Sequence, residues 1–324
     1  MIRAASVGLG WWGKTLANSI QNSEKINVVM ATTKTLNNIE DYCKEIDAEI
    51  AASYDEVVKS DKVDAVILAT PHSKHLEQIV QAVNNGKHVF CEKPITLTAA
   101  DAKIAFDEAK KNNKILAVGF NRRFHPNFMK IIEMVKSNTL GKIVHIEGTI
   151  NAPGLWMYKP ESWRSSSAET PAGGMTGMGI HVIDQMISAN GDISSAYAQT
   201  AKVIKMGELD EVTSVLFKFA NGATGYLGTS IASSVLYNFR VIAENGAIEI
   251  TSRDLSVMKY TPREGDIEIT EVKDVDMCKN ELEAFADAVN GHADYPVTAE
   301  QGIHGAEVFE AVIKSAEKET LIKI

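Results

Sequence analysis

The sequence predicts an α/β protein with a doubly wound parallel sheet first and, after it, a second α/β part with a mainly antiparallel sheet. Over roughly the first 120 residues, short apolar runs alternate with stretches whose apolar residues repeat at helical spacing. A Gly-x-Gly-x-x-Gly turn follows the first run, and Asn-Gly pairs stand between apolar runs in the second half. Strand–helix alternation is typical of doubly wound parallel sheets. Asn-Gly between apolar runs is the strongest short signal for a hairpin.

The first element is a strand that opens into a glycine-rich turn. Small and β-branched residues at positions 4–7 lead into Gly-Leu-Gly-Trp-Trp-Gly, and a helical stretch follows at residues 14–21. In this context the spacing predicts a dinucleotide-binding turn; a glycine turn without a ligand is the alternative. Gly8 permits the tight turn, Gly10 lets the backbone approach a pyrophosphate, and Gly13 lets the helix pack closely on the strand. The variable positions hold two indoles that pack either on a ligand or in the core, Trp11 and Trp12.

The second strand is predicted over residues 26–32, and the residues at its end indicate which dinucleotide binds. NAD-binding proteins usually carry an Asp or Glu about twenty residues past the glycines, where it accepts the ribose 2′-hydroxyl. This sequence has Thr32, Thr33 and Lys34 there instead. A carboxylate would repel a 2′-phosphate, whereas two hydroxyls and an ammonium would bind one through charge-assisted hydrogen bonds. We therefore predict a preference for NADP over NAD; a solvated turn at the strand end is the alternative.

The strand–helix alternation continues through the first half of the chain. Apolar runs predict buried strands over residues 63–69, 88–91 and 115–119. Thr98, with Asp101 three residues on, predicts the start of a helix through a variant of the capping box. Ligands bind at the carboxyl ends of the strands in such sheets. The candidate ligand-binding segments all follow predicted strands and comprise residues 8–13, 32–34, 70–75 and 92–94.

The pattern changes after Phe120. Asn221-Gly222 and Asn245-Gly246 each stand between apolar runs and predict hairpins of an antiparallel sheet, and two helical stripes close the chain. No Gly- or Pro-rich linker separates the two parts. The predicted domains are therefore residues 1–121, which bind the dinucleotide, and residues 122–324, which bind the substrate.

The composition favours a soluble globular protein that acts on small molecules. The chain of 324 residues is 45% hydrophobic and 23% charged, with a formal net charge of −9. Without a basic cluster, this charge argues against nucleic acid or an anionic membrane as a partner. No apolar run approaches the ~18 residues that span a bilayer. The first strand begins at the N-terminus, so we expect no signal peptide and a cytoplasmic protein. The cysteines are three in number and scattered, which suits a reducing compartment.

Lys93 is the first candidate for chemistry. It follows a predicted strand, stands beside Glu92, and precedes Pro94, whose ring restricts the preceding backbone. A lysine near a nicotinamide can polarise a substrate oxygen, or act as a base if burial lowers its pKa. An exposed lysine at a strand end is the alternative.

His181 is the second candidate. It lies in a glycine-rich segment, residues 173–184, that leads into a predicted helix. Histidine titrates near neutral pH and can take a proton from a carbinol, although a single histidine on a helix is more often structural. The other histidines form no ligand pair at i, i+4 spacing, so we predict no metal site.

Together these segments resemble the Gfo/Idh/MocA family of oxidoreductases across essentially the whole chain, and the Glu-Lys-Pro triplet is the most specific element. The resemblance rests on Gly8 to Gly13, Thr70-Pro71 with His75, Gly86 to Val89 running into Glu92-Lys93-Pro94, Gly119 to Phe124 with Pro126, Trp163-Arg164, and the glycine-rich stretch through His181 and Asp184.

The resemblance implies a Rossmann domain followed by an α/β domain with a large open sheet, whose outer face commonly makes dimers or tetramers. It also implies NAD(P)-dependent interconversion of an alcohol and a carbonyl group on sugars, inositols or related diols. Lys93 would touch both nicotinamide and substrate, and the position of His181 is a common catalytic partner. The residues expected beside the cofactor are Thr70, Pro71, His75, Glu92, Asn121, Trp163 and Arg164.

One position departs from the family. Many members carry an Asp four residues before the histidine, and this sequence has Gly177 there. The expected activity is hydride transfer on a polyhydroxylated or cyclic substrate, with Lys93 polarising the oxygen and His181 relaying its proton. We expect Arg123 or His125 to hold polar groups of the substrate. The alternatives are a sensor that binds the dinucleotide without turnover, and a dehydrogenase of the dihydrodiol type.

Overall fold

The computed structural model describes residues 1–324, and the chain divides into two compact units. The first unit comprises Met1–Asn121 together with Asp276–Ile303, and the second comprises Arg122–Val275 together with His304–Ile324. The sequence predicts a boundary between residues 121 and 122, and the first unit has a boundary there. The predicted second domain, however, is not continuous, because residues 276–303 belong to the first unit.

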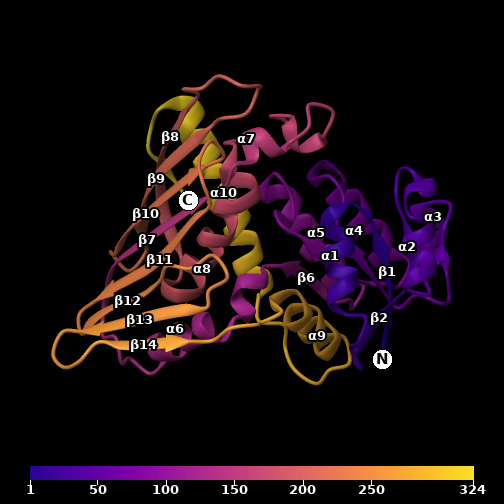
Figure 1. Ribbon diagram of the computed structural model, residues 1–324, viewed down its shortest axis with the longest axis horizontal. Coiled ribbons are helices and arrows are strands. Elements are labelled where there is room, and N and C mark those ends of the chain that lie inside the picture. The colour runs from indigo at the N-terminus through magenta and orange to yellow at the C-terminus, as the bar shows by residue number, and fades with distance from the viewer. The chain divides into compact units, whose positions relative to one another are not determined.

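The first unit is built on a parallel sheet of six strands in the order β3-β2-β1-β4-β5-β6 (Figure 1). Its strands are β1 (Ile2–Val7), β2 (Ile26–Thr32), β3 (Glu49–Ile50), β4 (Ala65–Leu68), β5 (His88–Glu92) and β6 (Leu116–Gly119). Its helices are α1 (Trp11–Ser19), α2 (Glu40–Glu45), α3 (Tyr54–Lys59), α4 (His75–Asn84), α5 (Ala99–Lys111) and α9 (Met277–Val289). The predicted doubly wound parallel sheet is thereby confirmed.

The order of the strands reverses at β1. The chain runs outward from β1 through β2 to β3, then returns to place β4 on the other side of β1. In sheets of this kind, ligands bind at the carboxyl ends of the strands where the order reverses. The glycine turn that begins at Gly8 directly follows β1 and therefore stands at this point.

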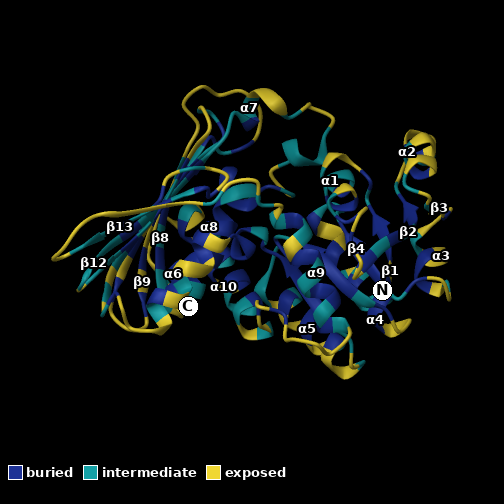
Figure 2. Ribbon diagram, turned by 60° about the horizontal axis from the view of Figure 1, so that its bottom comes forward, coloured by how far each residue is buried: buried dark blue, intermediate teal, exposed yellow.

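The strands β4 and β6 of this sheet are buried on both faces, and Figure 2 draws the strands at the centre of this unit in dark blue. Every residue of β4 and of β6 is buried, which explains why both appear in the sequence as continuous apolar runs. The helix predicted from Thr98 is α5, and the Thr98 hydroxyl accepts a hydrogen bond from the Asp101 backbone N–H, as a capping residue does.

Residues 276–303 complete the first unit. The Phe285 ring of α9 meets the Phe90 ring of β5 edge to face, with centroids 5.9 Å apart. Ser23 donates a hydrogen bond to Glu283, and the Tyr295 hydroxyl donates to the backbone oxygen of Val118 in β6 at 3.0 Å. This segment, distant in sequence, is thus part of the packing around the parallel sheet.

The second unit is built on a sheet of nine strands in the order β14-β13-β12-β11-β7-β10-β9-β8-β15. The strands β7 and β10 pair in parallel and the other neighbours pair antiparallel. The strands are β7 (Ile143–Asn151), β8 (Ile193–Ala201), β9 (Val212–Phe219), β10 (Thr224–Ser230), β11 (Leu236–Ala243), β12 (Gly246–Ile250), β13 (Val257–Pro262), β14 (Glu268–Glu271) and β15 (Ile322–Lys323). Both predicted Asn-Gly hairpins are present, between β9 and β10 and between β11 and β12. The large, mainly antiparallel sheet is confirmed.

The helices of the second unit are α6 (Pro126–Lys136), α7 (Gly154–Met157) and α8 (Ile180–Asn190), and α10 (Ala299–Lys318) continues into this unit from residue 304. Of these, α6 and α8 pack on one face of the sheet. Phe128 of α6 packs edge to face on Phe239 of β11, with centroids 5.7 Å apart. Gly148 of β7 lets α8 approach closely, because a Cβ there would lie 2.2 Å from a methyl of Val182. These contacts form the core of the second unit.

The other face of the sheet carries a row of side chains that runs across seven strands, from Tyr197 on β8 to Lys259 on β13. At one end the row is apolar, with Leu216 between Tyr197 and Tyr226. At the other end it is charged, and Arg240 forms ion pairs of 2.9 Å with Glu147 and 2.6 Å with Glu249. Leu216 is 57% exposed, so the apolar end of this row faces solvent in the isolated chain.

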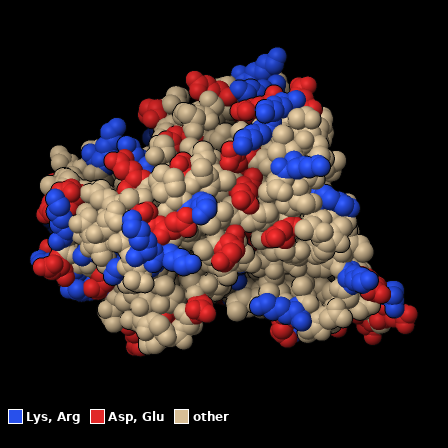
Figure 3. Space-filling view, turned by 180° about the vertical axis from the view of Figure 1, so that it is seen from behind, with Lys and Arg blue, Asp and Glu red and all other residues tan.

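The face of the molecule drawn in Figure 3 carries charged side chains of both signs. Lysines and arginines alternate with aspartates and glutamates over the face drawn in Figure 3, without a broad area of one sign. None of the helices combines the length and apolar character that crossing a bilayer requires. The cysteines, Cys43, Cys91 and Cys278, are all buried and free.

Candidate active site

The three glycines of the turn after β1 have different surroundings. Gly8 has a φ of +92°, and a Cβ there would lie 2.6 Å from the Ala69 backbone oxygen. A Cβ at Gly13 would lie 2.3 Å from the backbone oxygen of Gly8. At Gly10, by contrast, no atom lies within 4 Å of such a Cβ. Gly8 and Gly13 are therefore needed for the turn itself, whereas Gly10 leaves space for a ligand at the backbone.

The start of α1 offers hydrogen-bond donors to that space. Gly10 is the N-cap residue and supplies no side-chain cap, and the first turn holds no acidic residue. A helix start of this kind binds anions through its free N–H groups and its dipole. The residues present thus fit the pyrophosphate of a dinucleotide.

The two indoles beside this turn differ in exposure. Trp11 is 77% exposed, so core packing does not account for it. Trp12 is half-buried, and its ring centroid lies 5.3 Å from that of Trp11. Of the two packing alternatives, the core is thus excluded for Trp11, and its contact with a ligand stays a prediction.

The residues at the end of β2 lie beside the same turn. The backbone oxygen of Thr32 accepts a hydrogen bond from Gly8 N at 2.9 Å, and the Thr32 side chain is buried. Thr33 is half-buried and Lys34 is exposed. Neither position carries a carboxylate, and the hydroxyl of Thr33 and the ammonium of Lys34 are the groups available to a 2′-phosphate.

The loops after β4 and β5 are joined by His75. Its Nδ1 lies 2.9 Å from the Pro94 backbone oxygen, and its Nε2 lies 3.1 Å from the Thr70 backbone oxygen. The sequence predicts a contact between His75 and the cofactor, but its side chain is fully buried. The structure differs here because both ring nitrogens face backbone oxygens, so His75 holds the two loops in place. Thr70 and Pro71 are half-buried at the same edge of the sheet.

Lys93 follows β5 and is half-buried. The carboxylate of Glu92 accepts a hydrogen bond from the Lys93 backbone N–H at 3.3 Å, and the peptide bond between Lys93 and Pro94 is cis. Glu92 itself is buried against Gly119 of β6, where a Cβ would lie 2.9 Å from Glu92 Oε1. The predicted cofactor residue Asn121 directs its amide to Cys278 Sγ at 3.7 Å. Lys93 thus lies at the edge of the parallel sheet where the strands have their carboxyl ends, and the glycine turn lies at the same edge.

In the second unit, the predicted glycine-rich segment forms a short π-helix, Met175–Gly179, that runs directly into α8. Single turns of π-helix occur frequently at functional sites. Gly173 and Gly179 are tightly packed, because a Cβ would lie 1.9 Å from the Asp210 backbone oxygen and 2.3 Å from Met175 Sδ, respectively. His181, in the first turn of α8, is 8% exposed.

Arg123 and His125 have partners that the sequence does not predict. The Arg123 guanidinium binds Asp184 of α8 through two hydrogen bonds of 2.8 and 2.7 Å, and both side chains are buried. Burial raises the pKa of the Asp184 carboxyl, and the guanidinium of Arg123 opposes this shift. His125 is 1% exposed and caps α6 by accepting a hydrogen bond from Asn127 N. Both side chains thus have partners inside the unit, and their predicted contacts with the substrate stay predictions.

Trp163 and Arg164 form a local stack. They lie in a short 3₁₀ turn capped by Ser162, and the Arg164 guanidinium carbon is 4.1 Å from the centroid of the Trp163 ring. Both side chains are half-buried. Stacking holds the cation in one place, and the predicted contact of this pair with the cofactor stays a prediction.

Sequence reasoning missed Tyr158, at the end of α7. Its hydroxyl lies 4.0 Å from the position that a Cβ would take at Gly177. No signal in the sequence connects the two residues, because they are nineteen positions apart and belong to different local elements.

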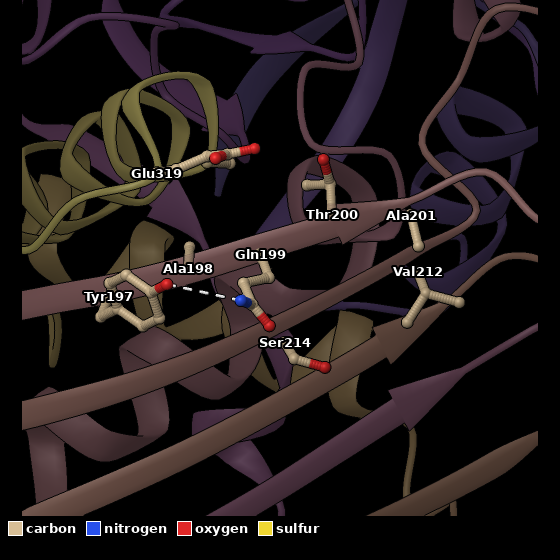
Figure 4. A pocket seen from close by; sticks show the side chains of 9 residues that line it. Tyr197, Ala198, Gln199, Thr200, Ala201, Val212, Ser214 and Glu319 are labelled. Atoms are coloured by element: carbon tan, nitrogen blue, oxygen red, sulfur yellow. Dashed lines mark hydrogen bonds between the residues drawn. The ribbon is translucent and has the colours of Figure 1, made fainter.

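A separate cavity of about 450 Å³ lies in the second unit at β8, next to the end of α10 (Figure 4). Figure 4 shows Tyr197, Gln199 and Ser214 around it, and the side-chain amide of Gln199 donates a hydrogen bond to the Tyr197 hydroxyl. None of the predicted site residues lines this cavity.

The chain belongs to the GFO/IDH/MocA family of oxidoreductases. Residues 2–120 match the family's NAD-binding Rossmann fold, and residues 128–249 match its C-terminal domain. The protein is therefore an oxidoreductase whose first unit binds a nicotinamide dinucleotide, which agrees with the open space at Gly10 and the uncapped start of α1.

Several characterised proteins are similar to this chain. Myo-inositol 2-dehydrogenase of Thermotoga maritima is 30% identical over 65% of this chain, an alignment that spans 63% of that protein. A scyllo-inositol 2-dehydrogenase (NADP(+)) of Bacillus subtilis is 26% identical over 85% of this chain and 83% of that protein. The solved structure of a levoglucosan dehydrogenase with NADH and levoglucosan, 19% identical, covers 100% of this chain and 99% of that chain with a TM-score of 0.89, which shows the shared fold.

Proposed function

We propose that this protein is an NADP-preferring oxidoreductase that interconverts an alcohol and a carbonyl group on a sugar, an inositol or a related cyclic polyol. The observation that carries the proposal is the position of Lys93. It follows β5 at the carboxyl edge of the parallel sheet, where Gly10 and the start of α1 leave space for the dinucleotide. The similarity to two inositol dehydrogenases supports this class of substrate.

In this proposal Lys93 binds the reacting oxygen. An ammonium that donates a hydrogen bond to a carbonyl oxygen polarises the C–O bond and favours addition of hydride at carbon. Glu92 holds the Lys93 backbone, and His75 holds the carbonyl of the following residue, Pro94. The lysine is thereby fixed at its base while its side chain remains accessible.

His181 moves the proton. A nicotinamide held at the glycine turn would supply the hydride chemistry. When the alcohol is oxidised, the imidazole of His181 takes the hydroxyl proton. When the carbonyl is reduced, His181 returns the proton to the oxygen. Neutral imidazole suits this role because its ordinary pKa lies near neutral pH.

The proposed preference for NADP rests on the end of β2. Thr33 and Lys34 offer a hydroxyl and an ammonium, and no carboxylate stands there to repel a 2′-phosphate. Lys34→Ala should weaken NADPH binding by roughly 10-fold, the value of one charge-assisted hydrogen bond, and leave NADH binding unchanged. Lys44→Ala, on α2, is the control. Equal losses for both cofactors, or NADH binding at least as tight as NADPH in the wild type, would refute the preference.

The decisive experiment combines a substrate panel with a Lys93 variant. Wild-type protein is assayed with sugars, inositols and their keto forms for consumption or production of NADPH. Lys93→Met should lower kcat by roughly 10²–10⁴-fold, the range for a positioned acid or base, with NADPH affinity retained. Lys103→Met, on the exposed face of α5, is the control. Near-normal turnover of Lys93→Met would remove Lys93 from the mechanism, and NADPH binding without turnover of any panel member would favour the sensor alternative.

The outer face of the nine-stranded sheet is the proposed contact between copies of the chain. The exposed apolar end of its row, with Leu216 between two tyrosines, is the type of surface that oligomers bury. We expect a homodimer or a homotetramer in solution. Leu216→Glu should reduce the mass measured by light scattering, and an unchanged mass would place the contact elsewhere.

A further inference from the structure

Gly177 differs from the other glycines of its segment. Gly173 and Gly179 have backbone or side-chain atoms within 2.3 Å of a built Cβ, so larger residues cannot stand there. A Cβ at Gly177 would touch nothing closer than the Tyr158 hydroxyl, at the ordinary contact distance of 4.0 Å. Nor does Gly177 have a positive φ, since it lies within a helix. Glycine in a helix is less stable than alanine, so neither packing nor backbone geometry accounts for it.

Tyr158 is held so that its hydroxyl faces this space. Its ring packs on Gly154, where a Cβ would lie 3.2 Å from two of the ring atoms. The residue is half-buried at the end of α7. Burial raises the pKa of Tyr158, against the opposing effect of Arg164 and Arg253, so the phenol is protonated at neutral pH. A protonated phenol can donate a hydrogen bond as well as accept one.

His181 lies on the same side of the helix as Gly177. The two are four residues apart, and residues at that spacing are neighbours on a helix surface. The absence of a side chain at 177 therefore leaves open the position next to the imidazole, and the Tyr158 hydroxyl borders that position.

We infer that Tyr158 is a substrate-binding residue whose hydroxyl donates a hydrogen bond to a substrate oxygen in the space over Gly177. The inference rests on the proposed function, because it concerns the same substrate. It also predicts a specificity. A carboxylate can only accept a hydrogen bond and so selects hydroxyl groups, whereas a phenol can also bind an oxygen that has no hydrogen. The site should therefore bind a keto-polyol or a ring ether oxygen at this position.

The test compares Tyr158→Phe and Gly177→Ala with two controls, Tyr260→Phe and Gly305→Ala. Tyr260 lies on β13 with its hydroxyl near the backbone oxygen of Asn245, and Gly305 lies in α10 with no atom within 4 Å of a built Cβ. Each variant is assayed for kcat and KM in both directions with the best panel substrate and for melting temperature. Tyr158→Phe should raise KM for the keto form about 5- to 100-fold, the range for an oxygen left without its donor. The rise in KM should be smaller for the corresponding alcohol. The control Tyr260→Phe should leave both KM values unchanged.

Gly177→Ala tests whether the space over Gly177 holds a substrate or is only unfilled space in the fold. It should raise the melting temperature or leave it unchanged, as Gly305→Ala should, because alanine favours the helix. Unlike Gly305→Ala, it should also raise KM, because the methyl group enters the space of the substrate. Kinetics of Gly177→Ala that equal those of Gly305→Ala, or equal rises in KM for the keto form and the alcohol in Tyr158→Phe, would overturn the inference while the proposed function stands.

A failure of the proposed function gives a different set of results from a failure of this inference. If the wild type turns over no panel member, the proposed function fails, and the inference is then tested by calorimetric binding of a keto-inositol to the NADPH complex. Binding that is weakened in Tyr158→Phe and Gly177→Ala but not in the controls supports the role of Tyr158. Binding that is equal in all five proteins, or absent from the wild type, overturns it.

Discussion

Asp184→Asn tests the buried ion pair that the structure shows between Arg123 and α8. The two side chains are 5% and 4% exposed and are joined by two hydrogen bonds of 2.7 and 2.8 Å. Asparagine has the same shape but no charge, so the Arg123 guanidinium would remain buried without its counter-ion. Removing one partner of a buried pair typically costs about 3–5 kcal/mol. For a unit of this size, that loss corresponds to a fall in melting temperature of roughly 10 °C.

Urea unfolding at pH 7, followed by circular dichroism, measures this loss in Asp184→Asn against Asp192→Asn, which changes an exposed aspartate in the same unit. The double variant Arg123→Met with Asp184→Leu removes both charges and should recover to within about 1 kcal/mol of the wild type, because apolar side chains can replace a buried pair. A loss below about 1 kcal/mol in Asp184→Asn would refute the reasoning. It would mean that the Arg123 charge is not held mainly by Asp184 and would reopen its predicted contact with the substrate.

Two further predictions concern the first unit. Gly10→Ala should leave the melting temperature unchanged but weaken NADPH binding at least about 10-fold by fluorescence titration, since its Cβ meets only the proposed ligand space. Gly13→Ala should lower both the melting temperature and the affinity for NADPH, because its Cβ would lie 2.3 Å from the Gly8 backbone oxygen. Equal melting temperatures of the two variants would contradict this reasoning. The pKa of His88 is lowered to about 4, chiefly by burial, and its neutral Nδ1 accepts a hydrogen bond from Ile115 N. A depressed histidine pKa gives stability that is present above the unfolded value of about 6.5 and is lost as the pH falls towards 4, so going from pH 7 to 5.5 should cost up to about 1 kcal/mol, less with solvent screening. His88→Asn should flatten that part of the urea-unfolding profile, and an unchanged slope would exclude His88 as its source.

Local signals in the sequence were sufficient for much of the fold. The second strand is predicted over residues 26–32 and is observed as Ile26–Thr32, because its run is mostly apolar and the polar residues Lys25 and Thr33 flank it. The Asn-Gly turns give both predicted hairpins for a similar reason. The strand β3 has only two residues, both exposed, and so leaves no apolar pattern to detect. The parallel pairing of β7 with β10 depends on packing between distant segments and has no local signature.

In the candidate site, too, some residues could be predicted from the sequence and others could not. The glycine turn and Lys93 could be predicted because each lies directly after a strand, at a position that the sheet topology makes accessible to a ligand. The ion pair of Arg123 could not be predicted, since its partner Asp184 is 61 positions away and a buried ion pair looks in sequence like two charged residues. Tyr158 was missed because its relation to Gly177 exists only after α7 and the π-helix have folded.

The return of residues 276–303 to the first unit has a consequence for the order in which the protein folds during synthesis. Residues 1–121 leave the ribosome first, but α9, whose Phe285 packs on Phe90, is made only after eight of the nine strands of the second sheet, all except β15, have been translated. At about 5–20 residues per second, the 182 residues between positions 121 and 303 take roughly 10–40 s. During that interval the parallel sheet lacks part of its cover, and the nascent chain exposes apolar surface that a chaperone can bind.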